Sequence, residues 1–125
     1  MRALCLGAMV LGCTVVVARS SAETPDPPDA TTLEAVRQKG QEVFTTNCMG
    51  CHGPTGGGGV GVPLAGNDFL EDTEYVIEQI VYGGGFMPGF GHLSDEEIAA
   101  VATYVRTSWG NDFGLVTVEE VAAHR

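Results

Sequence analysis

The sequence predicts an all-α fold of about four helices joined by long loops. Apolar residues recur at helical spacing in three segments, and no segment alternates convincingly between apolar and polar residues as a strand does. Two of the three segments begin with Ser or Thr followed three residues later by Glu, the capping-box pattern of helix starts. The length of 125 residues suggests one domain.

The N-terminus has the pattern of an export signal. Met1 and Arg2 give a positive start, residues 3–17 are almost wholly apolar, and small residues precede a cleavage site after Ala22. We therefore expect residues 1–22 to be a secretory signal peptide. Its removal predicts a periplasmic protein with no stable membrane insertion.

Two other interpretations of this segment stay open. It can remain as an uncleaved anchor, although its apolar run is short against the roughly 20 residues that a spanning helix needs. It can also be a lipoprotein signal acylated at Cys13, since Val10-Leu11-Gly12-Cys13 has that pattern, although the apolar run continues to Val17.

The chain after the predicted cleavage site is strongly acidic. Residues 23–30, with three prolines and three acidic residues, are predicted to form a disordered leader before a folded domain over residues 31–125. All 16 acidic residues but only four of the six basic ones lie beyond residue 22, which gives a net charge of −12 with neutral histidines. Such a surface repels phosphate, so nucleic acid and anionic membranes are poor partners.

The first helix is predicted over residues 32–45, with Thr31 and Glu34 as its capping box. Gly40 lies inside it, where glycine is unfavourable by about 1 kcal/mol relative to alanine. A close crossing with another helix would explain that glycine. The glycine-rich stretch over residues 53–67 is predicted to be a flexible surface loop, because it lacks the Gly-Lys-Ser/Thr and the strand of a phosphate-binding loop.

Two further helices follow. One is predicted over residues 73–82, with Asp72 as N-cap and a run of three glycines at its end. The other is predicted over residues 95–109, with a Ser94–Glu97 capping box at its start and Gly-Asn after its end. Residues 119–123 are expected to add one helical turn.

The Cys48-Met49-Gly50-Cys51-His52 run predicts covalent attachment of one haem c. Each cysteine sulfur can add to one vinyl group of the same porphyrin, and the adjacent histidine can bind the iron from one face. A zinc site would need two more ligands at close spacing, which the sequence lacks. A thioredoxin-like redox pair would sit beside a βαβ pattern, which is also missing.

Met87 is predicted to be the second axial ligand. It lies beside Gly and Pro, which is typical of a loop, whereas a methionine that only fills the core would lie on a helix face. Phe86 and Phe90 can shield such a site. His92 is the rival ligand, and the plain interpretation of both His92 and His124 is a solvated surface residue.

These motifs resemble those of class I monohaem cytochromes c over residues 31–111. The resemblance implies that the first and last helices cross at Gly40 and Phe44 of one and Tyr104 of the other. It also implies that the carbonyl of Pro63 accepts a hydrogen bond from Nδ1–H of the axial histidine. The lysine ring with which mitochondrial cytochrome c docks acidic partners is missing.

The stretch from Met87 to Asn111 is further similar to bacterial cytochromes that serve quinoprotein alcohol and aldehyde dehydrogenases. This likeness implies an electron carrier, not an enzyme, with redox protein partners: a periplasmic dehydrogenase as donor and an oxidase or another cytochrome as acceptor. Two alternatives stay open. The chain can be a fixed cytochrome subunit of such a dehydrogenase, or a haem catalyst or gas sensor with an open iron site.

Overall fold

The structure, a computed structural model, describes residues 30–125. The predicted signal peptide and all but the last residue of the predicted leader lie outside this range. The helices are α1 (Ala30–Asn47), α2 (Met49–His52), the 3-10 helix η1 (Asp68–Glu71), α3 (Thr73–Tyr82), α4 (Asp95–Arg106) and α5 (Val118–Ala123). Within this range the only strand-like pairing is an isolated bridge between Gly84 and Met87, so the all-α prediction is confirmed.

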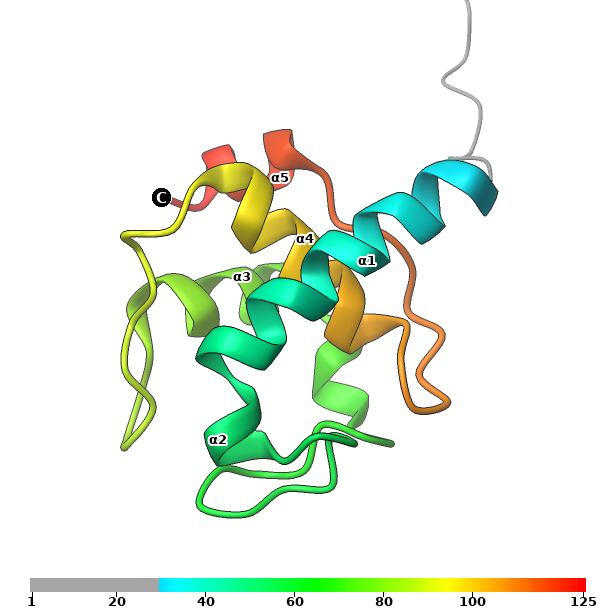
Figure 1. Cartoon of the computed structure of the whole chain (residues 1–125). Coiled ribbons are helices and arrows are strands. Elements are labelled where there is room, and N and C mark those ends of the chain that lie inside the picture. The colour runs from blue at the N-terminus through cyan, green and yellow to red at the C-terminus, as the bar shows by residue number, and fades with distance from the viewer. Residues whose placement is uncertain (1–29) are drawn as a thin grey trace, which may run out of the picture.

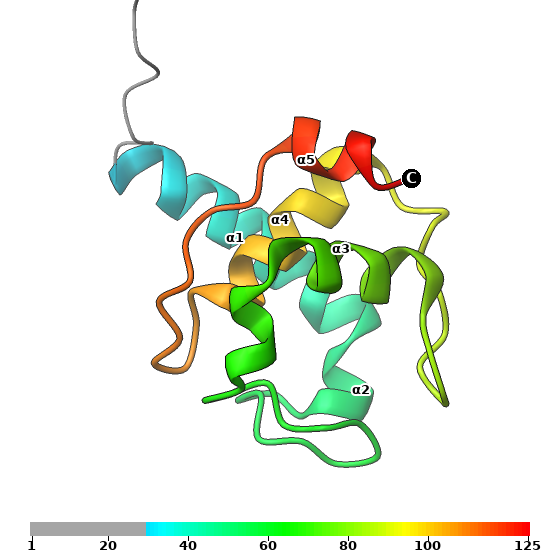
Figure 2. The same ribbon diagram turned by 180° about the vertical axis from the view of Figure 1, so that it is seen from behind.

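The crossing of α1 and α4 organises the fold (Figure 1). At Gly40 the two backbones approach so closely that a Cβ would lie 2.6 Å from Cβ of Tyr104 and nearer still to the carbonyl oxygen of Ala100. The rings of Phe44, Tyr104 and Trp109 pack beside this contact, with centroids 5.2 to 5.4 Å apart. The predicted close crossing at Gly40 is confirmed. On the side of α4 away from α1, α3 and α5 pack against it (Figure 2).

Local capping sets three of the helix starts. Asp72 accepts a hydrogen bond from the backbone of Tyr75 at the start of α3, and Ser94 forms the expected capping box with Glu97 at the start of α4. A second capping box, not predicted, begins α5 at Thr117. These side chains satisfy backbone N–H groups that have no partner inside the helix.

Two predicted helices have other bounds in the structure, the first ending at Asn47 and not at residue 45. The first helix begins at Ala30, so Thr31 lies inside its first turn and does not precede the helix as a cap. The last long helix ends at Arg106, three residues before the predicted end at Trp109. Trp109 adopts a left-handed backbone conformation, with φ of 55°, and its ring joins the aromatic contact between α1 and α4. Tertiary packing of that ring therefore overrides continuation of the helix.

No helix among residues 30–125 combines the length and the apolar character that crossing a membrane requires.

Candidate haem site

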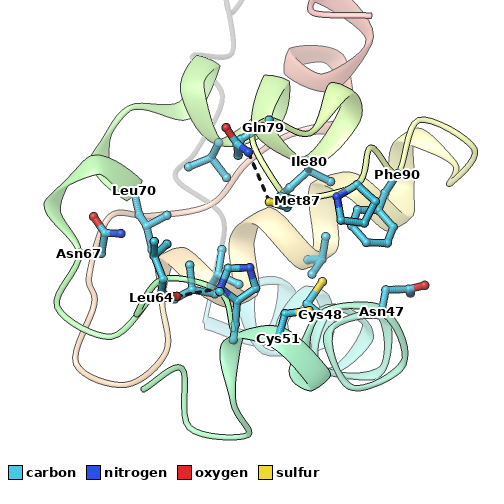
Figure 3. A pocket seen from close by; sticks show the side chains of 18 of the residues that line it. Asn47, Cys48, Cys51, Leu64, Asn67, Leu70, Gln79, Ile80, Met87 and Phe90 are labelled. Atoms are coloured by element: carbon cyan, nitrogen blue, oxygen red, sulfur yellow. Dashed lines mark hydrogen bonds between the residues drawn. The ribbon is translucent and has the colours of Figure 1, made fainter. Parts of the chain in front are cut away.

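A pocket of about 410 Å³ opens between α2, the loop after it, α3 and the segment that carries Met87. Its volume lies within the range of small-molecule sites, roughly 300 to 1,000 Å³. The lining is mostly apolar and includes no Asp, Glu, Lys or Arg of the described chain. Four predicted site residues line it together: Cys48, Cys51, His52 and Met87. Figure 3 shows the two cysteines on one side of the pocket and Met87 on another.

The short helix α2 brings the cysteines and the histidine onto one side. The backbone N–H groups of Cys51 and His52 both donate to the carbonyl of Cys48, at 3.1 and 3.0 Å. Residues three and four positions apart share a helix face, so the three side chains point the same way. Gly53, with φ of 79°, ends the turn in a conformation that residues with a Cβ adopt rarely.

The state of the cysteines argues against the competing interpretations. Burial, with a smaller effect from Cys51, raises the pKa of the Cys48 thiol to about 11. Redox-active cysteines of the thioredoxin kind have lowered pKa values instead. Neither cysteine belongs to a cluster of three His, Cys, Asp or Glu side chains of residues 30–125 that is close enough to hold one metal ion.

The imidazole of His52 is held in a defined orientation. Its exposed fraction is 8%, and Nδ1 lies 2.8 Å from the carbonyl oxygen of Val62. When Nδ1 carries the proton and donates to this oxygen, Nε2 keeps its lone pair for a metal. Gly61 packs on the ring, since a Cβ there would lie 2.9 Å from Cε1 of His52.

The predicted role of Pro63 was wrong. The carbonyl that faces His52 belongs to Val62, whereas the carbonyl of Pro63 accepts a hydrogen bond from Asn67 at 3.0 Å. Every residue offers a carbonyl, so the sequence did not reveal which one would face the ring. Pro63 still has an indirect effect, because a proline biases the residue before it toward extended conformations and so restricts Val62.

Met87 reaches the pocket on a tight turn. Its backbone N–H donates to the carbonyl of Gly84, and the N–H of Gly84 donates back to the carbonyl of Met87, both at 3.0 Å. Gly85 within this turn has φ of 60°. The Sδ atom of Met87 accepts a hydrogen bond of 3.4 Å from Nε2 of Gln79 on α3 (Figure 3). Sequence reasoning missed Gln79; the available signal was an amide beside the apolar positions of α3.

The rival ligand His92 and the remaining histidine, His124, do not reach the pocket. His92 is exposed, and its ring faces Phe90 at a centroid distance of 6.1 Å. Nδ1 of His124 lies 4.0 Å from Oε1 of Glu74, an exposed residue of α3. Neither histidine lines the pocket, whereas Phe86 and Phe90 both do, Phe86 being fully exposed.

Two buried polar side chains attach the surrounding loops to α4. Asn111 donates to the carbonyls of Leu64 and Val105, at 2.9 and 2.8 Å, and accepts from the backbone of Gly66 at 2.9 Å. Arg106 donates to the carbonyls of Leu70, at 2.8 Å, and Glu71, at 3.1 Å. Burial lowers the pKa of Arg106 from its usual value. Leu64, Leu70 and Val105 all line the pocket, so these bonds hold three parts of its wall together.

Comparison with known proteins also indicates a haem protein. The family model described as cytochrome C oxidase, cbb3-type, subunit III matches residues 35–105. The cytochrome c subunit of a quinone-dependent alcohol dehydrogenase from Gluconacetobacter polyoxogenes is 33% identical over 82% of this chain and 26% of that protein. The corresponding subunit from Gluconobacter oxydans is 34% identical over 66% of this chain. The chain thus spans only about a quarter of these subunits, namely 26% and 21%.

Smaller relatives match over most of their length. Cytochrome c-552 of Thermus thermophilus is 34% identical over 71% of this chain and 76% of its own. The solved structure of cytochrome CL from Methylophaga aminisulfidivorans covers 79% of this chain and 74% of that one, with a TM-score of 0.56 and 22% identity, which supports the fold. Since the family model matches more than half of the chain, the protein belongs to the cytochrome c family of haem-containing electron carriers and has the class I cytochrome c fold.

Proposed function

We propose that this chain is a periplasmic electron carrier with one haem c, attached through Cys48 and Cys51 and ligated at the iron by His52 and Met87. The observation that carries the proposal is the convergence of these four side chains on one apolar pocket without charged lining residues. Bound there, haem supplies a reversible change between ferric and ferrous iron.

The residues around the pocket suit this role. The contact of His52 with the carbonyl of Val62 orients the imidazole and makes it a stronger donor to a metal. A thioether as second ligand favours the reduced state. The uncharged lining acts in the same direction, because ferric haem carries one more positive charge than ferrous haem and is costlier to bury. With both axial positions filled by side chains, a haem catalyst or gas sensor is disfavoured.

The partners we propose are redox proteins. The donor is a periplasmic dehydrogenase, and the acceptor is an oxidase or another cytochrome. Support comes from relatives named as alcohol dehydrogenase subunits and as a cbb3-type oxidase subunit, FixP of Bradyrhizobium diazoefficiens, which is 35% identical over 66% of this chain. Val60, Val62 and Phe86 line the pocket and are exposed, so they are apolar side chains that a partner can contact on an otherwise acidic chain.

A second candidate is a fixed cytochrome subunit of a quinoprotein alcohol or aldehyde dehydrogenase, favoured by the same dehydrogenase relatives. Gentle purification of the tagged full chain from its source separates the two. Stoichiometric recovery with a large quinoprotein supports the subunit, and recovery as a small coloured protein alone supports the carrier.

Covalent attachment is tested with the full chain expressed for export alongside a haem-attachment system. The wild type should give a haem-stained band on a denaturing gel and a mass increased by one haem, while Cys48→Ser with Cys51→Ser should give neither. The mass also reports whether cleavage follows Ala22. A colourless wild-type protein with the mass of bare polypeptide would contradict the proposal.

A further inference from the structure

Three side chains that can bind a metal meet where the segment after α5 reaches α3. Glu74 and Glu78 belong to α3, and His124 directly follows α5. One ligand atom of each residue lies within 4.8 Å of those of the other two. None of the three lines the haem pocket. We infer that they form a binding site for one divalent cation of a transition metal such as zinc. This inference does not depend on the ligands proposed for the haem iron.

Helix α3 presents the two carboxylates on one face. Glu74 and Glu78 are four positions apart, so their side chains are neighbours on the helix surface, and both are exposed. Val76 and Ile80, two positions further along in each case, are buried and line the haem pocket from the opposite face. Like charges at this spacing destabilise a helix. A cation bound between the two carboxylates would remove that repulsion.

The imidazole of His124 is presented to α3 by an anchored backbone. The carbonyl of His124 accepts a hydrogen bond of 3.2 Å from the hydroxyl of Tyr82, and the end of the chain lies beside α3 (Figure 2). The next residue, Arg125, places Nε 2.7 Å from Oδ1 of Asp95. Nδ1 of His124 already lies 4.0 Å from Oε1 of Glu74. Because the backbone is held on both sides, little freedom remains to be lost when a ligand binds.

The Lys and Arg side chains of residues 30–125 do not neutralise the two carboxylates. The ion pairs that arginines form in this range are with Glu34 and Asp95. The basic side chain within 4.0 Å of Glu74 is that of His124. With a neutral imidazole the three side chains carry two negative charges, which attract a divalent cation and which such a cation balances.

The donor set indicates the class of metal. Imidazole suits zinc, copper and nickel, whereas magnesium and calcium prefer oxygen ligands alone. With metal–ligand distances of about 2.0 to 2.2 Å, the ligand atoms around one ion lie about 3 to 4 Å apart. The three side chains therefore need to approach one another by about 1 Å, which rotation of the exposed glutamates allows. Water would complete the coordination.

The test is calorimetric titration of the purified, haem-loaded full chain with zinc chloride and, separately, with magnesium chloride. Glu74→Gln, Glu78→Gln and His124→Gln each remove one ligand. Glu42→Gln, at an exposed position of α1, and His92→Gln, at the other exposed histidine loop, are the matched controls. The ferric absorption band at the red end of the spectrum, which reports sulfur-to-iron bonding, is recorded to compare the haem site of each variant with that of the wild type.

We expect the wild type to bind one zinc ion per chain and to bind magnesium more weakly. Loss of an outer-shell partner of a metal ligand already costs about 10- to 100-fold in affinity, so each ligand variant should bind zinc at least about tenfold more weakly. Both controls should match the wild type. Zinc should also raise the temperature of unfolding of the wild type, because only the folded chain brings His124 to α3.

Unchanged zinc affinity in the three ligand variants would overturn the inference, and so would an equal loss in the two controls. Equal affinity of the wild type for zinc and magnesium would also overturn it, since binding would then reflect only the acidic surface. Should one ligand variant fail to accumulate, the other two decide the question. None of these outcomes changes the proposed function, because the three side chains lie outside the haem pocket.

Discussion

The imidazole Nδ1 of His52 lies 2.8 Å from the carbonyl oxygen of Val62, ten residues further along the chain. This contact joins the Cys-x-x-Cys-His turn to the glycine-rich loop after it. The backbone N–H of Gly61 strengthens the junction by donating to the carbonyl of Cys51 at 2.9 Å. A loop that the sequence presents as a flexible surface segment is therefore one wall of the pocket.

Replacing Gly61 should disturb this junction. In Gly61→Ala the new methyl group would lie 2.9 Å from Cε1 and 3.0 Å from Nδ1 of His52, so the ring or the loop must shift. We expect the free energy of unfolding, measured in urea, to fall by about 1 to 3 kcal/mol, the usual cost of overpacking. Gly57→Ala is the control in the same loop, because its Cβ would meet only Thr55 Oγ1, at 3.7 Å. Equal stability of the two variants would contradict the packing of Gly61 on His52.

The crossing of α1 and α4 predicts a large effect at Gly40. In Gly40→Ala the added methyl group meets the backbone of Ala100 and Cβ of Tyr104, neither of which can move without separating the helices. We expect a loss of about 3 kcal/mol in the free energy of unfolding, at the upper end of the overpacking range. Gly50→Ala, inside α2 with nothing within 4 Å of its Cβ, should be neutral or stabilising by up to about 1 kcal/mol. Chemical denaturation measures both.

Asn111 should be essential to the stability of the pocket wall. Asn111→Leu removes two donors and one acceptor and leaves backbone groups of Leu64, Gly66 and Val105 without their partner. Each unsatisfied buried group costs about 1 to 3 kcal/mol, so we expect destabilisation by roughly 3 kcal/mol or more. A loss below about 1 kcal/mol would mean that water or a local shift replaces these bonds. Thermal and urea unfolding give the comparison.

Arg106 should not be replaceable by lysine. Its guanidinium donates to two carbonyls of η1, those of Leu70 and Glu71, in a fork that an ammonium group cannot reproduce. Arg106→Lys should lose about 1 to 2 kcal/mol, and Arg106→Met more, because both carbonyls then lack a donor. Arg37→Met, at a partly exposed pair with Glu34, should change stability by less than about 0.5 kcal/mol.

Removing the predicted thioether ligand should open the iron. Met87→Ala should keep covalent haem, because the cysteines are untouched, but lose the red ferric band, lower the midpoint potential and allow added imidazole to bind. Met49→Ala should keep all three properties of the wild type, since Met49 packs against the core and does not line the pocket. An unchanged potential in Met87→Ala would exclude Met87 from the site.

Features encoded by near neighbours were predictable. Three local predictions were confirmed: the bounds of α3, the Asp72 cap and the Ser94–Glu97 box. The cap and the box are hydrogen bonds between residues three positions apart. The alignment of the side chains from Cys48 to His52 is also local, since it takes only one helical turn. The crossing at Gly40 was predictable because glycine inside a helix is unfavourable without a packing reason.

Contacts between distant residues were decided by tertiary packing. The carbonyl that faces His52 belongs to Val62 and not to Pro63, and a carbonyl has no side-chain signature in the sequence. Trp109 leaves the helix because its ring packs on Phe44, 65 positions earlier. The approach of Gln79 to Met87 likewise depends on how the turn at Gly84 folds back on α3. Periodicity identifies which face of a helix is buried, but only the packed chain determines which atom each side chain meets there.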